Sequence, residues 1–442
     1  MNLIPPPKVA KLQEALRAKA KGAPTYRFYM LYDKVYRADV LRHAYACCKA
    51  NGGAAGVDGQ TFVDIEKDGG LERWLAELTE DLRKKTYKPK PVRRAWIAKG
   101  DGKRRPLGIP TVRDRVVQMA AVLVLEPIFE TDLQPEQYAY RSGRGALDAI
   151  RAVHGLVNGG YTEVVDADLS GYFDSIPHHE LMKSVARRLS DRHLLHLIKM
   201  WLEMPVEEKD GRGGMRRTTR NRDEGRGTPQ GAVISPLLAN LYMRRFVLGW
   251  KTLGHGETLD AKLVNYADDF VICCRGTGEQ AIAAMRDMMT KLRLTVNETK
   301  TRLCRLPEET FDFLGYTIGR CYSPKTGRAY LGTYPSAKRV RRLVEMISVR
   351  TERRTLYREP AELVNRLNEK IVGWAHYFRL GPVSKAYDRV NRHVCQRLRR
   401  WLCRKFNVVG AGLRQFSDAQ LREDLGLVDL RELRRRFLCA NA

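Results

Sequence analysis

Apolar residues recur every three or four positions in several long stretches of this sequence. That spacing places them on one face of an α-helix, so each stretch predicts an amphipathic helix. The predicted helices cover residues 8–21, 71–86, 112–127, 178–189 and 235–250, and residues 278–296 predict a helix that leads into a strand. Two prolines mark boundaries, because Pro127 is expected near the end of one helix and Pro177 at the start of another.

Between the helices, short apolar runs predict β-strands. Residues 161–169 form one strand, and residues 264–274 form two strands joined by a polar tip, which predicts a hairpin. Two prolines favour an extended chain over residues 87–97, and Asp101-Gly102 after it predicts the turn of a second hairpin. Residues 206–228 are rich in Gly and Arg and predict a loop or ribbon.

Two aspartates, Asp268 and Asp269, stand side by side at the tip of the predicted hairpin. Adjacent carboxylates repel each other, and burial would raise their pKa values, so a divalent cation would relieve both effects. Side chains alternate along a strand, so a third carboxylate is needed, and Asp168 at the end of an earlier strand can supply it. An oxygen-only set favours Mg²⁺, and two ions about 4 Å apart would suit phosphoryl chemistry. Taken alone, paired aspartates in a loop more often form a turn or a helix N-cap than a metal site, and neighbouring Asp166 and Asp174 are interpreted as structural.

The chain carries far more positive charge than solubility requires. Its 442 residues include 79 Lys and Arg against 51 Asp and Glu, a net charge of +28. Such a field indicates a polyanionic partner, most often nucleic acid, although basic ribosomal-type proteins and membrane-surface proteins share this composition. Residues 335–442 hold 25 Lys and Arg against 11 Asp and Glu, and their periodicity predicts a separate basic helical unit.

Cysteine use and the N-terminal sequence indicate an unexported protein. The nine cysteines show no CxxC spacing, so they predict neither a zinc ribbon nor a disulfide framework. The N-terminal segment has no apolar core of signal-peptide length, and the longest apolar run, 119–125, is too short to cross a bilayer. We therefore expect a soluble cytoplasmic protein with no membrane partner. The sequence does not indicate an oligomeric state.

A series of short motifs follows in a set order. They are RRPLGIP (104–110), the strand ending at Asp168, RGTPQGAVISP (226–236), YADD (266–269), LTVNETKT (294–301), FDFLGY (311–316) and IVGWAHYFRLG (371–381). The ordered set resembles the reverse transcriptase/maturases encoded by bacterial group II introns, of the type that lacks an endonuclease. The resemblance implies an α+β fold, a right-hand polymerase whose fingers and antiparallel palm sheet precede an all-α thumb and maturase (X) region.

The resemblance also implies domain boundaries. These are residues 1–60 for an N-terminal extension of basic helix and loop, 61–334 for fingers and palm, 335–400 for the thumb and X region, and 401–442 for a short basic tail. No Cys/His-rich endonuclease follows, so target cleavage by this chain is not expected.

The resemblance assigns the metal site to the acidic residues already singled out. It implies that Asp168, Asp268 and Asp269 are catalytic and, with the backbone carbonyl of Leu169, hold two Mg²⁺ ions. Asp269 would be the less tightly held ligand.

A further set of residues would contact the incoming nucleotide in this family. By resemblance they are Arg93, Lys99, Arg105, Phe173, Gln230 and Gly231. Guanidinium and ammonium groups suit phosphate, and an aromatic ring at Phe173 would exclude a ribose 2′-hydroxyl and so select dNTPs. Each residue also has a structural alternative. The cations could belong to a solvated basic face, Phe173 could pack in the core, and Gln230 and Gly231 could form a plain turn. At 97–100 this chain has IAKG where relatives have Ile-Pro-Lys-Pro, a departure close to Lys99.

Two assignments lie further along the chain. Lys300 resembles the residue that would protonate the leaving pyrophosphate, although a surface lysine fits its position equally. Phe313, Leu314 and Gly315 resemble the grip that holds the primer end, with a core strand as the alternative.

The aromatic residues of the maturase region are Trp374, Tyr377 and Phe378. Their spacing places them on one helix face, which favours packing between helices. The resemblance implies RNA contacts on the basic surface around them.

The resulting hypothesis is an RNA-directed DNA polymerase that binds its parent group II intron RNA and assists its splicing and mobility. Its partners would be that RNA, an RNA template with a DNA primer, dNTPs and a DNA target. Two alternatives stay open: an intron-free domesticated reverse transcriptase, and a non-enzymatic RNA-binding splicing cofactor with a vestigial polymerase. A viral-type RNA polymerase is disfavoured by Phe173.

Overall fold

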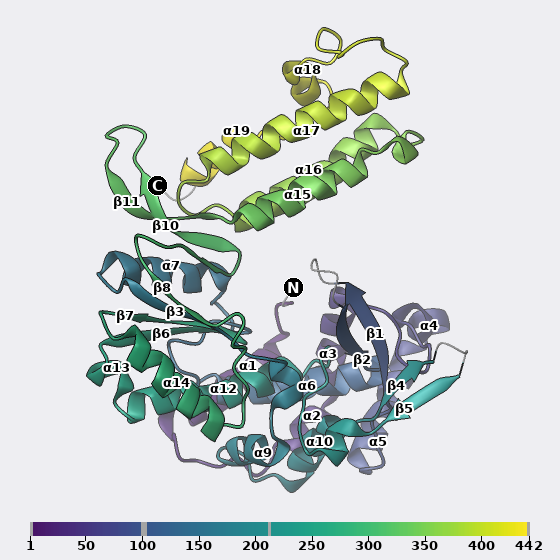
Figure 1. Ribbon diagram of the computed structural model, residues 1–442. Coiled ribbons are helices and arrows are strands. Elements are labelled where there is room, and N and C mark those ends of the chain that lie inside the picture. Colours follow the sequence, from purple (N-terminus) through teal and green to yellow (C-terminus); the bar gives the residue numbers. More distant parts are fainter. Residues whose placement is uncertain (1–2, 99–103, 211–213, 440–442) are drawn as a thin grey trace. The chain divides into compact units, whose positions relative to one another are not determined.

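The computed structural model describes residues 3–98, 104–210 and 214–439 (Figure 1). The chain divides into two compact units. One comprises Met1–Gly145, Ala167–Phe270 and Glu279–Thr301, and the other comprises Ala146–Asp166, Val271–Gly278 and Arg302–Ala442. Within the described ranges, no helix is both long and apolar enough to cross a membrane.

The first unit is mainly helical, as the periodicity predicted. Its longer helices are α1 (Pro7–Gly22), α3 (Ala38–Asn51), α5 (Leu71–Arg83), α6 (Val112–Phe129), α9 (His178–Ala186), α10 (Arg192–Leu202), α12 (Ser235–Thr252) and α14 (Gly278–Lys291). Its short helices are α2 (Tyr32–Val35), α4 (Phe62–Glu66), α8 (Tyr172–Ser175), α11 (Arg220–Asp223) and α13 (His255–Thr258). The predicted helices are therefore confirmed, with differences of a few residues at their ends.

Most side chains of helix α6 are buried in this unit. Val117 and Val124, for example, have no solvent-exposed surface. The helix continues to Phe129, past the proline where the sequence predicted its end. Pro127 has no N–H to offer the carbonyl one turn earlier, that of Leu123. The side-chain amide of Gln13 on α1 donates to that carbonyl instead, at 3.0 Å. The lost backbone bond is thus replaced, and the helix tolerates the proline.

A four-stranded sheet with the order β2-β1-β4-β5 belongs to the same unit. Its strands are β1 (Val92–Ala98), β2 (Arg104–Ile109), β4 (Val206–Lys209) and β5 (Met215–Thr218). Strands β1 and β2 pair antiparallel, which confirms the strands of the predicted basic hairpin, while the turn predicted at Asp101-Gly102 lies outside the described residues. Strands β4 and β5 form a second antiparallel pair. The stretch 206–228 is therefore a ribbon followed by α11.

A second four-stranded sheet has the order β6-β7-β3-β8. Its strands are β3 (Glu163–Asp168), β6 (Ala261–Tyr266), β7 (Asp269–Cys274) and β8 (Arg302–Arg305). The strand predicted over 161–169 and the hairpin predicted over 264–274 are confirmed. The strand expected after α14 does not form, since Val296 makes only a single antiparallel bridge to Leu169.

The second unit adds a three-stranded antiparallel sheet, a helix and a helical bundle. The sheet has the order β11-β10-β9, with β9 (Phe311–Phe313), β10 (Tyr316–Tyr322) and β11 (Ala329–Pro335), and the separate helix is α7 (Ala146–Asn158). The bundle contains α15 (Ala337–Arg350), the 3₁₀ turn η2 (Arg353–Thr355), α16 (Pro360–Tyr377), α17 (Ser384–Lys405), α18 (Asp418–Glu423) and α19 (Leu430–Cys439). Leu343, Leu367, Leu398 and Trp401 are among its buried core residues. The predicted helical character of the chain after residue 335 is confirmed.

Candidate active site

The paired aspartates lie at a tight turn between β6 and β7. Ala267 and Asp268 form the turn, and Asp269 is the first residue of β7. Ala267 has a φ of 59°, a left-handed conformation that costs energy for a residue with a side chain. The buried side chain of Asn265 stabilises this conformation by donating to the Ala267 carbonyl at 2.8 Å. The turn leaves Asp268 half-buried and Asp269 exposed.

Asp168 ends strand β3, as predicted, and the segment after α14 lies beside it. The backbone N–H of Asn297 donates to the Asp168 carbonyl at 2.8 Å, and the amide of the same side chain donates to Oδ2 at 3.1 Å. The Lys300 ammonium also reaches Oδ2, at 2.6 Å. Leu169, the next residue, is buried and bridges to Val296. Two segments distant in the sequence therefore bring a carboxylate and an ammonium together.

The acidic residues and Lys300 influence one another electrostatically. Burial raises the pKa of Asp268, and the neighbouring Asp168 carboxylate raises it further, whereas Arg105 and Lys300 act in the opposite direction. The hydrogen bond to Asp168 raises the pKa of Lys300, and the charges of Asp269 and Asp268 add to that effect. Partly buried carboxylates that repel one another create the electrostatic conditions that a bound cation relieves.

The donor chemistry of this site fits magnesium. Carboxylate oxygens are the hard ligands that Mg²⁺ prefers, and Asp268 lies under both burial and repulsion. In the part of the chain that the structure describes, no three His, Cys, Asp or Glu side chains are yet arranged closely enough to hold a metal ion. In this arrangement, Oδ2 of Asp168 accepts hydrogen bonds from Lys300 and Asn297. A metal ion bound at Oδ2 would compete with Lys300 for that oxygen.

The TPQG loop lies directly against strand β2. The backbone N–H of Gly108 donates to the Gln230 carbonyl at 2.6 Å. Gly231 has a φ of 108°, and a Cβ there would lie 2.7 Å from the Gly108 carbonyl oxygen, so only glycine fits. The Arg105 Nε donates to Gln230 Oε1 at 3.0 Å, and Gln230 Nε2 donates to Asp174 Oδ2 at 2.8 Å. Arg105, Gln230 and Gly231 are thus neighbours.

The remaining residues expected at the nucleotide have other surroundings. Phe173 is 7% exposed, its ring packs edge-on against Tyr172, and its carbonyl accepts from the Thr228 N–H at 2.7 Å. Arg93 donates through both Nε and Nη2 to the Ala55 carbonyl, at 3.0 and 2.7 Å, so its guanidinium is already engaged. Lys99 lies outside the described residues.

Three residues near the site were not singled out as functional by the sequence. Asn297 lies inside the NETKT motif, so its position could have suggested it. Asp174 was interpreted as structural, yet it orients the Gln230 amide. Tyr140 gave no sequence signal. It has a left-handed φ of 54°, and burial together with the Asp268 carboxylate raises its pKa.

The residues of the expected primer grip form a tight turn in the second unit. Phe313 ends β9, and Leu314 and Gly315 follow with φ values of 50° and 86°. The Tyr377 hydroxyl donates to the Leu314 carbonyl at 2.7 Å. The φ of Gly315 favours glycine, and a Cβ there would lie 2.9 Å from Arg339 Nε.

The maturase-region aromatics support this turn from helix α16. The Phe378 ring packs against Trp374 and Tyr377, with centroids 4.8 Å apart in both pairs, and against Tyr316 at 5.1 Å. Phe378 is buried and Trp374 is half-buried. These rings therefore pack within the protein.

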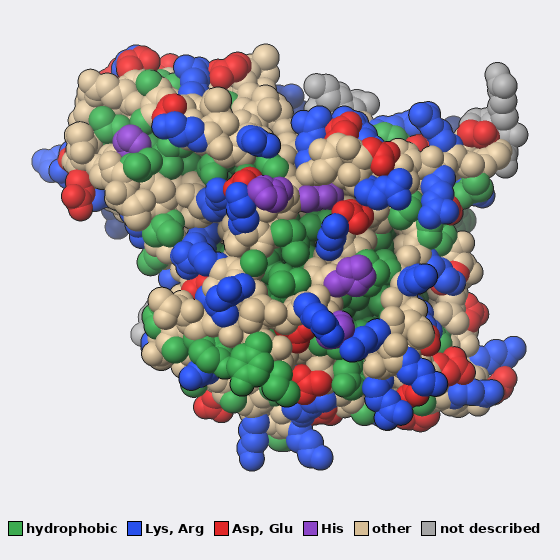
Figure 2. Space-filling model, turned by 90° about the horizontal axis from the view of Figure 1, so that it is seen from below, with side chains coloured by type: hydrophobic (Ala, Val, Ile, Leu, Met, Phe, Trp, Pro, Cys, Tyr) green, Lys and Arg blue, Asp and Glu red, His purple; other side chains and the backbone are tan. Residues whose placement is uncertain are grey.

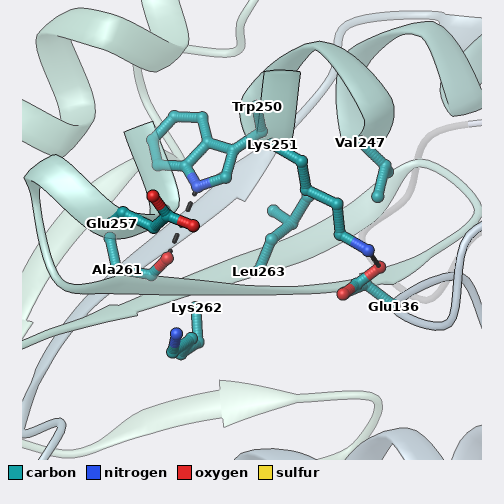
Figure 3. A pocket seen from close by; sticks show the side chains of 9 residues that line it. Glu136, Val247, Trp250, Lys251, Glu257, Ala261, Lys262 and Leu263 are labelled. Carbon is teal, nitrogen blue, oxygen red and sulfur yellow. Dashed lines mark hydrogen bonds and ion pairs between the residues drawn. The ribbon is translucent and has the colours of Figure 1, made fainter. Parts of the chain in front are cut away.

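A cavity of about 320 Å³ lies beside strand β6 and is separate from these residues (Figure 3). Lys251 forms an ion pair with Glu136 at 2.7 Å, and the Trp250 indole donates to the Ala261 carbonyl at 3.4 Å. Lys262 and Glu257 also line the cavity, and none of the predicted site residues does.

Comparison with known proteins identifies the family. The reverse transcriptase (RNA-dependent DNA polymerase) family matches residues 97–318, and the group II intron, maturase-specific domain matches residues 340–416. Protein YkfC of Escherichia coli (strain K12) is 31% identical over 367 residues, which cover 75% of this chain and 93% of YkfC. The group II intron-encoded protein LtrA of Lactococcus lactis subsp. cremoris is 32% identical over 353 residues, which cover 66% of this chain and 57% of LtrA.

The chain belongs to the reverse transcriptases, the RNA-directed DNA polymerases. The maturase-specific domain that follows identifies it further as a reverse transcriptase/maturase of the group II intron-encoded type. The resemblance drawn from the motifs is thereby confirmed, together with the α+β polymerase fold and the enzyme class. By family, the protein binds RNA, acts on a nucleic-acid template and primer, and assists intron splicing and mobility. Reverse transcriptases generally use Mg²⁺.

Proposed function

We propose that Asp168, Asp268 and Asp269, with the carbonyl of Leu169, hold two Mg²⁺ ions and catalyse the addition of dNTPs to a DNA primer on an RNA template. Bound Mg²⁺ would supply activation of the primer hydroxyl and stabilisation of the leaving pyrophosphate. The observation that carries this proposal is the grouping of Asp168, Lys300 and Asn297 beside the Asp268 turn.

The surrounding side chains would bind and orient the nucleotide. Arg105 would offer its fork-shaped guanidinium to the triphosphate, and Lys99 would add a point charge. Gln230, fixed between Arg105 and Asp174, would meet the sugar or base, and Gly231 would allow close backbone approach. Phe173 would exclude a 2′-hydroxyl by clash.

Lys300 is suited to handle the proton of the leaving group. Its ammonium lies on Asp168 Oδ2, within reach of the three carboxylates. When the carboxylates take up cations, Lys300 would be displaced toward the leaving pyrophosphate and would donate a proton to it.

In the second unit, we propose that Phe313, Leu314 and Gly315 hold the primer end. Helix α16 would position this turn through Tyr377. The domain limits implied by the family, 1–60, 61–334, 335–400 and 401–442, belong to the same proposal.

The RNA partner we propose is the parent group II intron, which also serves as template, with a DNA target site as the point of insertion. Lys and Arg side chains are spread widely over the face drawn in Figure 2, in keeping with the net charge of +28. Binding should weaken steeply as salt rises, because phosphate contacts release counterions. The protein would stabilise the splicing-active RNA fold by binding it preferentially.

Primer extension on an RNA template with dNTPs and Mg²⁺ tests the proposal. The wild type should extend the primer, and Asp268→Ala should not, while its RNA affinity is kept. Asp287→Ala is the matched control, because Asp287 is exposed on α14 and paired with Lys291. Equal extension by wild type and Asp268→Ala would show that the assigned carboxylates are wrong.

A further inference from the structure

A cavity of about 670 Å³ is lined by residues at the C-terminal end of α17. Its wall consists of the turn η2, the last turns of α17 and the loop that joins α17 to α18. Three arginines line it, Arg353 from η2 and Arg400 and Arg404 from α17, and no acidic residue does. The cavity lies within residues matched by the maturase-specific domain. Its volume is in the range of about 300–1,000 Å³ that is typical of small-ligand sites.

The three arginines are available to an external anion. All three are exposed, and in the part of the chain that the structure describes none of them forms an ion pair. Neighbouring arginines differ, since Arg354 pairs with Glu352 at 2.8 Å and Arg399 pairs with Asp418. Guanidinium groups without carboxylate partners, converging from two elements, favour a ligand with phosphate oxygens.

The cavity is pre-organised by contacts that fix η2 to α17. The buried Trp401 indole donates to Thr355 Oγ1 at 3.0 Å. The Lys405 ammonium donates to the carbonyls of Leu356 and Arg358, at 3.1 and 2.8 Å. Arg353 is therefore held beside the α17 arginines before any ligand binds, which reduces the entropy lost on binding.

The remaining wall is mostly apolar, with the amide of Asn407 as its one polar side chain. Leu356 and the buried Cys403 provide apolar surface, and Gly410 and Ala411 provide backbone. The loop approaches α17 closely at Gly412. This residue has a φ of 64°, and a Cβ there would collide with Cys403 Sγ. A flat apolar group can therefore enter between the arginines and the loop.

We propose that this cavity binds one unstacked nucleotide of an RNA strand, with its phosphates on Arg353, Arg400 and Arg404 and its base against Leu356 and Cys403. The inference rests on the proposed function in naming an RNA contact of the maturase domain. Bases in loops and bulges are free to leave the stack, whereas bases in a duplex are not, so the site would distinguish single-stranded from double-stranded RNA.

The test compares two double variants of the full chain. Arg400→Gln/Arg404→Gln removes two cations from the cavity, and Lys385→Gln/Arg389→Gln removes two exposed cations, also four residues apart, from the first turns of the same helix. The probes are a short unstructured RNA and a blunt duplex of the same sequence, without dNTPs or Mg²⁺. Fluorescence anisotropy gives the Kd across a salt series, and thermal unfolding confirms that each variant folds.

The cavity variant should bind single-stranded RNA about tenfold more weakly than the wild type. The slope of log Kd against log salt concentration should be smaller by about 1.4. On the duplex, the cavity variant should differ far less from the control variant. Ala411→Glu, which adds a carboxylate without removing an arginine, should show the same selective loss. Equal losses in both double variants, or equal losses on both RNAs, would overturn the proposal in favour of a diffuse positive field. A polyglutamate peptide that binds with the same dependence on Arg400 and Arg404 would also overturn it. Wild-type primer extension, measured separately, decides the proposed polymerase function independently.

Discussion

The ammonium of Lys300 lies 2.6 Å from Oδ2 of Asp168. This contact places a cation against a carboxylate that the proposed mechanism needs for Mg²⁺. Asn297 donates to the same oxygen at 3.1 Å, so a cation and an amide together orient the carboxylate within the protein. Lys300 and a metal ion would therefore compete for Asp168.

Replacing Lys300 by Gln should separate metal binding from turnover. The Mg²⁺ concentration for half-maximal extension should fall, because the competing ammonium is gone. The maximal rate should fall about 100-fold, the typical contribution of a general acid. Single-turnover extension across a Mg²⁺ series measures both effects. Lys291→Gln, which removes a lysine from α14, is the control, and an unchanged Mg²⁺ requirement in Lys300→Gln would contradict the competition.

Asp268→Asn should stabilise the metal-free protein at neutral pH. The pKa of Asp268 is raised by burial, so the folded state holds its proton more tightly than the unfolded state does. The protonated carboxyl of Asp268 therefore favours the folded state at low pH. This stabilisation is lost as pH rises through the raised pKa, because the ionised carboxylate is unfavourable in the fold. Thermal unfolding in EDTA should give a higher Tm for Asp268→Asn at pH 7, with a difference that shrinks toward pH 4.

Added Mg²⁺ should raise the Tm of the wild type but not that of Asp268→Asn, because only the wild type keeps its ligands. Asp287→Asn serves as the charge control. A lower Tm for Asp268→Asn than for wild type at pH 7 would refute the raised pKa.

Arg93 and Arg105 should respond differently to truncation. Arg93→Ala leaves the Ala55 carbonyl without two donors and should lower the free energy of unfolding by about 2 kcal/mol. Arg105→Ala should change stability little, since Arg105 is exposed, and should raise KM for dNTP about tenfold through loss of a phosphate contact. Chemical unfolding measures the free energy of unfolding, and steady-state primer extension measures KM for dNTP. If Arg93→Ala unfolds like wild type but loses dNTP affinity, its main role is at the triphosphate.

Phe173 should set the preference for deoxynucleotides. A smaller side chain would open space for a 2′-hydroxyl, so Phe173→Val should increase rNTP incorporation relative to dNTP by about tenfold. Phe173→Leu retains more volume and should lie between Val and the wild type. Competition between dCTP and CTP in primer extension gives the ratio. No change in that ratio in either variant would leave Phe173 with only its packing role against Tyr172.

Local sequence patterns predicted the elements that carry the acidic residues. Asp168 ends a strand and Asp268 lies in a hairpin turn because strand formation and two-residue turns depend on neighbouring residues. The basic hairpin of β1 and β2 followed from the same kind of information.

Contacts between distant residues escaped prediction. The amide of Gln13 replaces the bond that Pro127 cannot make, over 110 residues away in the chain. The hydrogen bond from Gln230 to Asp174 also joins separate segments, so the sequence offered no reason to prefer a functional role for Asp174. Such contacts depend on tertiary packing, which periodicity and turn chemistry do not encode.

The most direct test of the central claim is the single-turnover rate of adding one dNTP to a primer on an RNA template, at saturating Mg²⁺. The account predicts a loss of at least about 1,000-fold in Asp168→Asn and in Asp268→Asn, the scale expected when preorganised electrostatic stabilisation is removed. Asp287→Asn should match the wild type. Rates within a few fold of wild type in both site variants would contradict catalysis by Asp168 and Asp268.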